Sequence, residues 1–293
     1  MSEASAGSGG RPGTGGGVPG PQSALRRRNG AARNATSGAS ARERWQRLAP
    51  EYLEALGKKE KGDFLRFRLL TPRLMGILGP LEGRRVLDVG CGDGYLARRM
   101  ARKGASVRAF DWVEALIAYA AAREKKEGLG ILYRVADASR AFSYGSETFD
   151  LVVCSMVLKD MPRIRTTVAE ISRVARKGGR FVLTVLHPCF CMNASQWEAR
   201  KALVREGARS LSFRVESPYP AVRGFAKTVS GSRAEILHFH RPVSYYARLL
   251  RRHGFLISGI WEPVLRAGPS VPARYNYATL LPPFLLMEGL KST

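Results

Sequence analysis

The 293-residue sequence predicts an α/β fold built on a doubly wound, mostly parallel β-sheet. Short apolar runs alternate along the chain with amphipathic segments of about ten to fifteen residues, a pattern typical of strands joined by crossover helices. The first apolar run also leads straight into a glycine-rich turn and then a helix. Such units place their strands side by side in one parallel sheet with helices on both faces.

Seven segments are expected to be strands because they are short and rich in apolar and β-branched residues. They are residues 85–89, 107–110, 131–135, 148–154, 180–186, 255–261 and 283–287. Four further segments carry apolar residues at three- and four-residue spacing and are expected to be helices. They are residues 95–103, 113–125, 166–176 and 243–253.

The chain is expected to form one folded domain, residues 43–293, behind a tail. Residues 1–42 consist largely of Gly, Ser, Ala, Pro and Arg, and this composition predicts disorder because it offers little apolar surface to bury. Residues 43–82 show helical spacing of large side chains, beginning with Trp45, Leu48 and Tyr52. The alternation lapses over residues 189–240, which predicts an insertion that shapes the substrate pocket.

The formal net charge is +24, and most of it belongs to the folded part, since residues 1–42 contribute six Arg against Glu3. Such a charge favours nucleic acid, an anionic membrane surface or an acidic substrate as partner, unless it reflects only an Arg-rich solvated surface. The sequence contains no run of about 18 apolar residues, so no transmembrane segment is predicted. A cytoplasmic location is expected, with organellar import through the Arg-rich, acid-poor tail as the alternative. Four irregularly spaced cysteines indicate no disulfide framework.

The glycine-rich turn follows Asp88 with the spacing G-x-G-x-G, formed by Gly90, Gly92 and Gly94. A dinucleotide-binding turn has the spacing G-x-G-x-x-G and holds a pyrophosphate at the helix start. Here a bulky tyrosine takes the third glycine position, and Asp93 would place negative charge beside a phosphate. The turn therefore predicts a ligand without phosphates.

The motif Val86-Leu87-Asp88-Val89-Gly90-Cys91-Gly92-Asp93-Gly94 resembles the first motif of class I S-adenosylmethionine-dependent methyltransferases. The small-molecule enzymes of ubiquinone and menaquinone biosynthesis are the most similar type. The resemblance implies a Rossmann-like seven-stranded sheet with an antiparallel last strand, and residues 43–82 as a helical lid. It implies S-adenosyl-L-methionine as cofactor, with no metal. The cofactor-binding residues it implies are Asp88, Gly90, Gly92, Gly94, Asp111, Trp112, Asp137, Ala138, Cys154 and Tyr52.

Three of these assignments have structural alternatives. The resemblance assigns Asp111 to the ribose hydroxyls, but the residue could equally cap the helix that follows. Asp137 is assigned to the adenine amine, yet an Asp in a loop is also a common turn former. Tyr52 would cover the sulfonium end of the cofactor if it does not simply pack in the core.

Candidate groups for the methyl acceptor lie beyond the carboxyl ends of the fourth and fifth strands, where open α/β sheets bind ligands. Asp160 and His187 are the candidate bases there. Asp160 could instead cap a helix, and His187 could fasten a loop. His238 and His240 would share one strand face and line the acceptor pocket, and their spacing relative to the nearby cysteines does not predict a zinc site.

These features predict a methyltransferase that acts on an oxygen, nitrogen or carbon atom of a small molecule. The +24 charge leaves RNA or another macromolecule as the alternative acceptor. Against that alternative, the segment Cys154-Ser155-Met156-Val157 lacks the Asn/Asp-Pro-Pro-aromatic element typical of enzymes that methylate base amines. A non-catalytic cofactor-binding protein is the third hypothesis. The sequence leaves the acceptor and the oligomeric state open.

Overall fold

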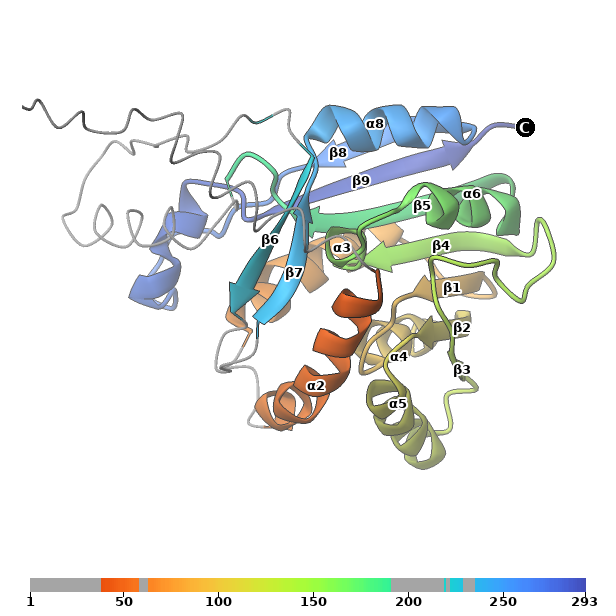
Figure 1. Ribbon diagram of the computed structural model, residues 1–293, viewed down its shortest axis with the longest axis horizontal. Coiled ribbons are helices and arrows are strands. Elements are labelled where there is room, and N and C mark those ends of the chain that lie inside the picture. Colours follow the sequence, from red (N-terminus) through yellow and green to blue (C-terminus); the bar gives the residue numbers. More distant parts are fainter. Residues whose placement is uncertain (1–37, 58–62, 191–218, 220–221, 229–234) are drawn as a thin grey trace, which may run out of the picture.

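The computed structural model describes residues 38–57, 63–190, 219, 222–228 and 235–293, and its centre is a seven-stranded sheet (Figure 1). The strand order is β3-β2-β1-β4-β5-β9-β8. The strands are β1 Arg85–Val89, β2 Ser106–Asp111, β3 Leu132–Val135, β4 Phe149–Ser155, β5 Ala175–Leu186, β8 Phe255–Trp261 and β9 Phe284–Lys291. The expected tail lies outside these ranges up to residue 37, as does most of the expected insertion.

The pairing of the strands confirms the predicted fold class. β1 pairs in parallel with β2 and β4, β2 with β3, and β4 with β5. Only β9, the last strand in the chain, runs antiparallel to its neighbours β5 and β8 in this sheet. All seven predicted strands are therefore present, and the last one has the predicted direction.

Alternating side chains of the strands build two apolar layers, one on each face of the sheet. Val86 of β1 packs in the layer beneath α3 (Thr71–Leu78) and α4 (Tyr95–Ala101). Leu87 packs in the opposite layer beneath α6 (Arg165–Val174) and α8 (Val243–Arg252). Helix α5, Glu114–Glu127, lies on the α4 side, with Ile117 in the first layer (Figure 1).

The N-terminal helical segment follows the prediction with one difference at its start. Helix α2 spans Gly38–Gly57, so it begins inside the segment expected to be disordered. It packs on the start of α5 through Ala49, which contacts Val113 and Leu116. A π-helical turn, η1, covers Arg66–Leu70 and runs directly into α3.

A separate two-stranded hairpin was not predicted. It consists of β6 (Arg223–Thr228) and β7 (Glu235–His240), paired antiparallel within the expected insertion. Strand β7 lies beside α2 and beside η2 (Leu158–Asp160), a 3-10 turn that follows β4. A second 3-10 segment, η3 at Ala273–Thr279, also has no counterpart in the expected elements. Among the described residues, no helix is long and apolar enough to cross a membrane.

One arginine ties the N-terminal helices to the sheet. Arg180 of β5 donates to the carbonyl oxygens of Leu78 and Ile77 at the end of α3, at 2.9 and 2.6 Å. It also pairs with Glu288 of the neighbouring strand β9. The guanidinium thus satisfies carbonyl groups that the end of a helix leaves without partners.

We expect Arg180→Met to lower the free energy of unfolding by about 2 kcal/mol, because it removes charge-assisted hydrogen bonds to partly buried acceptors. Arg85→Met is the matched control, since Arg85 forms an exposed ion pair with Asp150 whose loss should cost less than about 1 kcal/mol. Urea denaturation of both variants makes the comparison. Equal losses would show that Arg180 is not a special anchor of α3.

Candidate functional site

A cavity of about 300 Å³ lies at the carboxyl ends of β1, β2 and β4, where the sequence predicted the ligand to bind. The glycine turn, the end of β2 and the turn after β4 form its sheet side. Residues of α2, η1 and α3 line it from the other side. Its volume is at the lower end of the range for small-molecule sites, about 300 to 1,000 Å³.

The three glycines of the turn all have positive φ, of 70°, 56° and 73° for Gly90, Gly92 and Gly94. Gly90 and Gly92 line the cavity, whereas Gly94 does not. A Cβ atom on Gly92 would meet nothing within 4 Å, so this position leaves open space where a ligand could approach the backbone. A Cβ atom on Gly94 would lie 2.5 Å from the Tyr133 hydroxyl, which indicates a packing role.

Asp111, at the end of β2, fastens the glycine turn to the start of α5. Its Oδ2 accepts from the backbone N–H of Gly92 at 3.0 Å, and its Oδ1 accepts from that of Val113 at 2.9 Å. Burial raises the pKa of this carboxyl group to about 6, although those backbone donors act in the opposite direction. The side chain still lines the cavity, as does Trp112, so the local fastening and a ligand contact are compatible.

Asp88, at the end of β1, has an unsatisfied oxygen. The residue is 1% exposed, and its Oδ2 is buried without a hydrogen-bond partner in the described part of the chain. Burial raises the pKa of the carboxyl group to about 7, and the charges of Asp111 and Asp93 add to that rise. Because a buried acceptor without a partner is costly, this oxygen is suited to a donor or cation supplied by a ligand.

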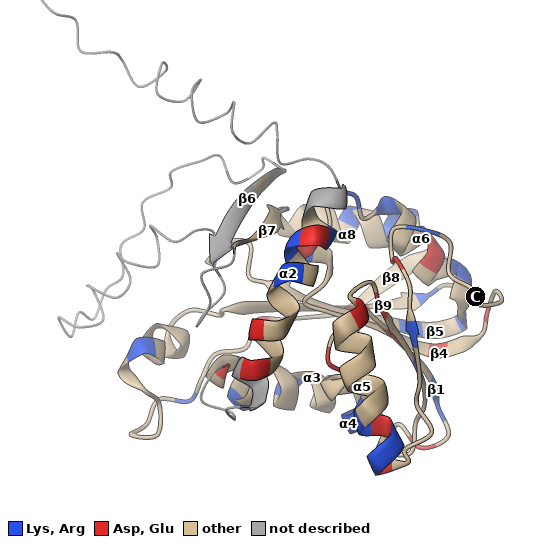
Figure 2. Cartoon of the chain, turned by 60° about the horizontal axis from the view of Figure 1, so that its bottom comes forward, with Lys and Arg blue, Asp and Glu red and all other residues tan. Residues whose placement is uncertain are grey.

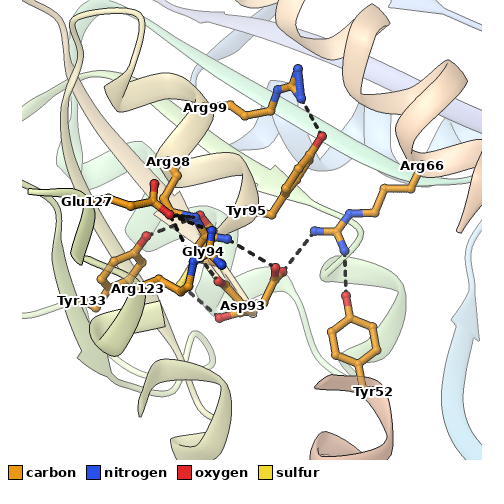
Figure 3. A network of polar contacts seen from close by, with 12 residues as sticks. Tyr52, Arg66, Asp93, Gly94, Tyr95, Arg98, Arg99, Arg123, Glu127 and Tyr133 are labelled. Atoms are coloured by element: carbon orange, nitrogen blue, oxygen red, sulfur yellow. Dashed lines mark hydrogen bonds and ion pairs between the residues drawn. The ribbon is translucent and has the colours of Figure 1, made fainter. Parts of the chain in front are cut away.

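A hydrogen-bonded network connects the N-terminal helices to the glycine turn (Figure 3). The Arg66 guanidinium donates to the Tyr52 hydroxyl at 2.8 Å and to Asp93 Oδ1 at 3.2 Å. Arg98 holds the same turn from the other side by donating to the Asp93 carbonyl at 2.7 Å. Burial raises the pKa of Tyr52 to about 12, so its hydroxyl stays neutral. Tyr52 and Arg66 both line the cavity.

Sequence reasoning missed Arg66. The residue follows a helical stripe in a chain with many arginines, and no motif distinguishes it from Arg68, which is exposed. Only the tertiary arrangement brings its guanidinium beside Asp93 in the cavity wall.

The charge of the cavity lining is opposite in sign to that of the whole chain. The ionisable Asp, Arg and Lys residues among the described lining are Asp63, Asp88, Asp93, Asp111, Asp160, Arg66 and Lys159. Five acids thus face two bases in a chain of net charge +24. Figure 2 shows Lys and Arg on other elements, including α6 and α8. A ligand that carries a net positive charge fits this lining better than an anion does.

Besides Gly94, two predicted cofactor contacts, Asp137 and Cys154, do not line the cavity themselves. Asp137 accepts from the backbone N–H and the hydroxyl of Ser139 at 2.8 and 2.7 Å, while its neighbours Ala136 and Ala138 line the cavity. These contacts are those of a residue that stabilises a turn, which was the structural alternative for Asp137. Cys154 is fully buried in the apolar layer under α6, and burial raises the pKa of its thiol.

The turn after β4 provides the cavity lining that follows Cys154. Ser155, Met156 and Val157 all line it. Met156 has φ 62°, a left-handed conformation that is uncommon for a residue with a side chain and often occurs at functional sites. This backbone turn directs the chain along the cavity toward Lys159 and Asp160.

Asp160 also lines the cavity, in a buried cluster with Lys159 and His238. Its carboxylate oxygens are 2.8 and 2.7 Å from Lys159 Nζ, and its Oδ1 is 2.7 Å from His238 Nδ1. Burial opposes ionisation, but the charges of Lys159 and His238 and their hydrogen bonds outweigh it and lower the pKa of Asp160. The group is therefore an ionised carboxylate at neutral pH.

His187, the second candidate base, does not line this cavity. Its Nδ1 accepts from the backbone N–H of Cys189 at 3.1 Å, and its Nε2 lies 2.6 Å from Glu262 Oε1. Its ring also stacks on Phe190, and burial lowers its pKa. Because both ring nitrogens have protein partners, His187 has the contacts of a residue that fastens its loop, the structural alternative considered for it.

His238 and His240 are buried and both line a second, small cavity next to Lys159. His240 Nε2 lies 2.8 Å from the Tyr219 carbonyl oxygen, so the two imidazoles have different partners. Arg241, which follows them, donates to the carbonyl oxygens of Leu158 and Met161 and so holds the turn that carries Asp160. Cys191 lies outside the described residues.

Comparisons with known proteins agree with this geometry. A family model described as a methyltransferase domain matches residues 87–183. A ubiquinone biosynthesis O-methyltransferase of Alkalilimnicola ehrlichii is 34% identical over 110 residues, which cover 38% of this chain and 44% of that protein. A second one, of Hahella chejuensis, is 35% identical over 107 residues, 36% of this chain and 45% of that protein. The chain thus spans less than half the length of these relatives.

Solved structures share the fold over a longer range. A putative S-adenosylmethionine-dependent methyltransferase from Listeria monocytogenes has a TM-score of 0.61 at 21% identity, covering 76% of this chain and 96% of that one. The predicted family resemblance is confirmed by the matched domain, the strand order and the turn after β1. Residues 87–183 of the chain therefore match a methyltransferase domain, within a fold shared with a putative S-adenosylmethionine-dependent methyltransferase.

Proposed function

We propose that the protein transfers a methyl group from S-adenosyl-L-methionine to a small-molecule acceptor. The observation that carries this proposal is the acidic cavity at the carboxyl ends of the strands, with the unpartnered Asp88 oxygen inside it. The cofactor has a sulfonium and an ammonium group against one carboxylate, so its net charge is positive. When bound, it supplies an electrophilic methyl group.

Each part of the cofactor has a suitable partner at one end of the cavity. We assign the ribose hydroxyls to Asp111, since a carboxylate accepts well from a diol and this one lines the cavity. Asp88 is suited to the ammonium group and Arg66 to the carboxylate. The open backbone at Gly92 allows close approach. The adenine contact of Asp137 stays a prediction, since its neighbours Ala136 and Ala138 line the cavity in its place.

The remaining end of the cavity suits a small, largely apolar acceptor. Apolar side chains that line it there come from α3, the β4 turn, β5 and the start of β9: Leu74, Met156, Met161, Leu186 and Phe284. The Asp160 carboxylate lies in the same lining and can accept a hydrogen bond from the methyl acceptor. We assign it as the group that receives the proton of the acceptor during methyl transfer. The relatives named O-methyltransferases support an oxygen atom as the methyl acceptor.

The chain's own residues then act mainly by alignment. Methyl transfer is an in-line displacement, so a fixed distance and angle between donor and acceptor supply most of the rate gain. The network of Tyr52, Arg66 and Asp93 holds the N-terminal helices over the cavity, and these helices would exclude water from it.

Asp111→Ala is expected to weaken S-adenosylmethionine binding at least tenfold in calorimetry, because the variant lacks the carboxylate assigned to the ribose. Glu114→Ala is the control, since this exposed carboxylate lies one turn away and does not line the cavity. Asp111 also holds the glycine turn, so thermal melting must show that the variant is folded. Unchanged affinity in a folded Asp111→Ala protein would refute the ribose assignment.

The preference for S-adenosylmethionine over S-adenosylhomocysteine should grow as the pH rises from 5.5 to 7. Asp88 and Asp111, with pKa values of about 7 and 6, gain negative charge over this interval. That charge attracts the sulfonium of the first ligand, whereas the second has a neutral thioether. We expect the ratio of the two dissociation constants to change on the order of tenfold, or about 1.4 kcal/mol.

Calorimetry with both ligands at each pH measures this ratio. The two ligands share the same amino-acid part and adenosine, so the ratio of their dissociation constants reports on the methylated, positively charged sulfur. The Asp88→Asn protein should show a smaller change because one of the titrating groups is absent. A ratio that does not depend on pH would contradict electrostatic selection of the sulfonium.

Transfer of a labelled methyl group into fractionated cell extract tests the class of acceptor. We expect the label in the small-molecule fraction, because the acids outnumber the bases in the described lining of the cavity, which disfavours a polyanion. Asp160→Asn is the control for enzyme-dependent label. Label that accumulates in RNA or protein instead would favour the macromolecular acceptor suggested by the charge of +24.

A further inference from the structure

The hairpin β6–β7 supplies a residue to the acceptor end of the cavity that the proposed function does not yet use. We propose that His238 is a positioning residue for Asp160, and that the cluster of Lys159, Asp160 and His238 selects an acceptor whose reacting group is a hydroxyl. This inference rests on the proposed function. It adds to that function the positioning role of His238 and the reason why the cluster favours a hydroxyl group as the acceptor.

The three side chains are brought together from distant parts of the chain. Lys159 and Asp160 lie on η2, and His238 lies 79 positions after Lys159, on β7. All three are at most 8% exposed. Lys159 and Asp160 line the large cavity, while His238 and Lys159 line the small one behind it. Lys159 therefore borders both cavities, with Asp160 in the lining of the large one and His238 in the lining of the small one.

The contacts of Asp160 fix the orientation of its carboxylate. The ionised carboxylate can only accept hydrogen bonds, so the 2.7 Å contact requires the proton of the imidazole to be on His238 Nδ1. Lys159 Nζ donates to both oxygens. Arg241 holds the backbone of the same turn through the Leu158 and Met161 carbonyls. With the carboxylate held on one side by His238 and Lys159, its remaining lone pairs are available to a donor in the large cavity.

The charges of the cluster favour a hydroxyl over an amine. A hydroxyl group donates its hydrogen to Asp160 and places its oxygen near the Lys159 ammonium, which stabilises negative charge on that oxygen. An aliphatic amine is protonated in water at neutral pH, and the same ammonium would repel it. The apolar residues around the cluster fit an acceptor with an apolar body, such as an aromatic ring.

The transfer balances with the ionised Asp160 carboxylate as the proton acceptor. The acceptor oxygen forms a bond to the methyl carbon while the bond from that carbon to sulfur breaks, and the electron pair of the broken bond stays on sulfur as a neutral thioether. In the same step the hydroxyl proton passes to Asp160, and the Lys159 ammonium stabilises the negative charge that develops on the oxygen as this proton leaves. The protonated carboxyl group then releases this proton to water.

The experiment measures methyl transfer from S-adenosylmethionine to phenol, catechol and 2-naphthol, with benzylamine and 2-phenylethylamine as amine counterparts that are protonated at neutral pH. We expect transfer to at least one of the hydroxyl compounds and a slower reaction with both amines. Calorimetry of the cofactor is run first. Failure to bind it would refute the proposed function itself, whereas binding without transfer to any hydroxyl compound, or faster transfer to an amine, would overturn the inference alone.

Variants at His238 test the positioning role. His238→Asn keeps an N–H donor near the place of Nδ1 and should retain kcat within about threefold, whereas His238→Ala should lose tenfold or more in kcat at similar cofactor affinity. His253→Asn is the matched control, since this histidine follows α8 and lines neither cavity. An Asn variant as inactive as the folded Ala variant, or a fully active Ala variant, would overturn the role.

Nitrogen-15 NMR of the histidine rings gives a readout that does not depend on turnover. The chain has only four histidines, so substitution of each one assigns its signals. We expect a protonated, hydrogen-bonded Nδ1 for His238 that shifts in Asp160→Asn. A His238 ring protonated on Nε2 alone, or one that does not respond to Asp160→Asn, would contradict the hydrogen bond on which the inference depends.

Discussion

The two hydrogen bonds of the Asp111 carboxylate hold together the part of the structure on which the site depends. One oxygen binds the glycine turn after β1, and the other binds the start of α5 after β2. Because β1 and β2 are parallel neighbours, a single side chain at the end of one can reach the loop of the other. The carboxylate therefore sets the spacing of two loops as well as presenting itself to the cavity.

This arrangement concentrates negative charge where burial makes it costly. Asp88, Asp93 and Asp111 lie at neighbouring strand ends, and both burial and mutual repulsion raise the pKa of Asp88 to about 7. Arg66 offsets part of this charge through Asp93. A cation bound in the cavity would offset more of this negative charge. Its binding would therefore also relieve the repulsion between the carboxylates.

The donor end could be predicted from sequence because its geometry is local. Asp88 lies near the end of β1, and Asp111 lies at the end of β2, about 25 positions later in the sequence. Consecutive parallel strands of this kind lie side by side, so the sequence predicts that the two carboxylates are at the same edge of the sheet as the glycine turn. The alternation of apolar runs along the chain predicted the seven strands, and the resemblance to methyltransferases implied the antiparallel direction of the last one. Arg66 could not be found this way, since its position depends on how the N-terminal helices pack over the sheet.

The acceptor end depends instead on contacts between remote segments. Local pattern identified Asp160, but its partner His238 is on a hairpin whose strands carry no clear alternation and follow two prolines. His187 illustrates the same dependence: its place after β5 predicted either a base or a residue that fastens its loop, and its contacts with Glu262 and the Cys189 backbone are those of the second role. The end of a strand shows where a reactive side chain can lie, but the hydrogen-bond partners of that side chain decide which protonation state and role it has. For Asp160 one of those partners, His238, comes from the hairpin, so the segment that interrupts the regular fold contributes to the proposed acceptor site.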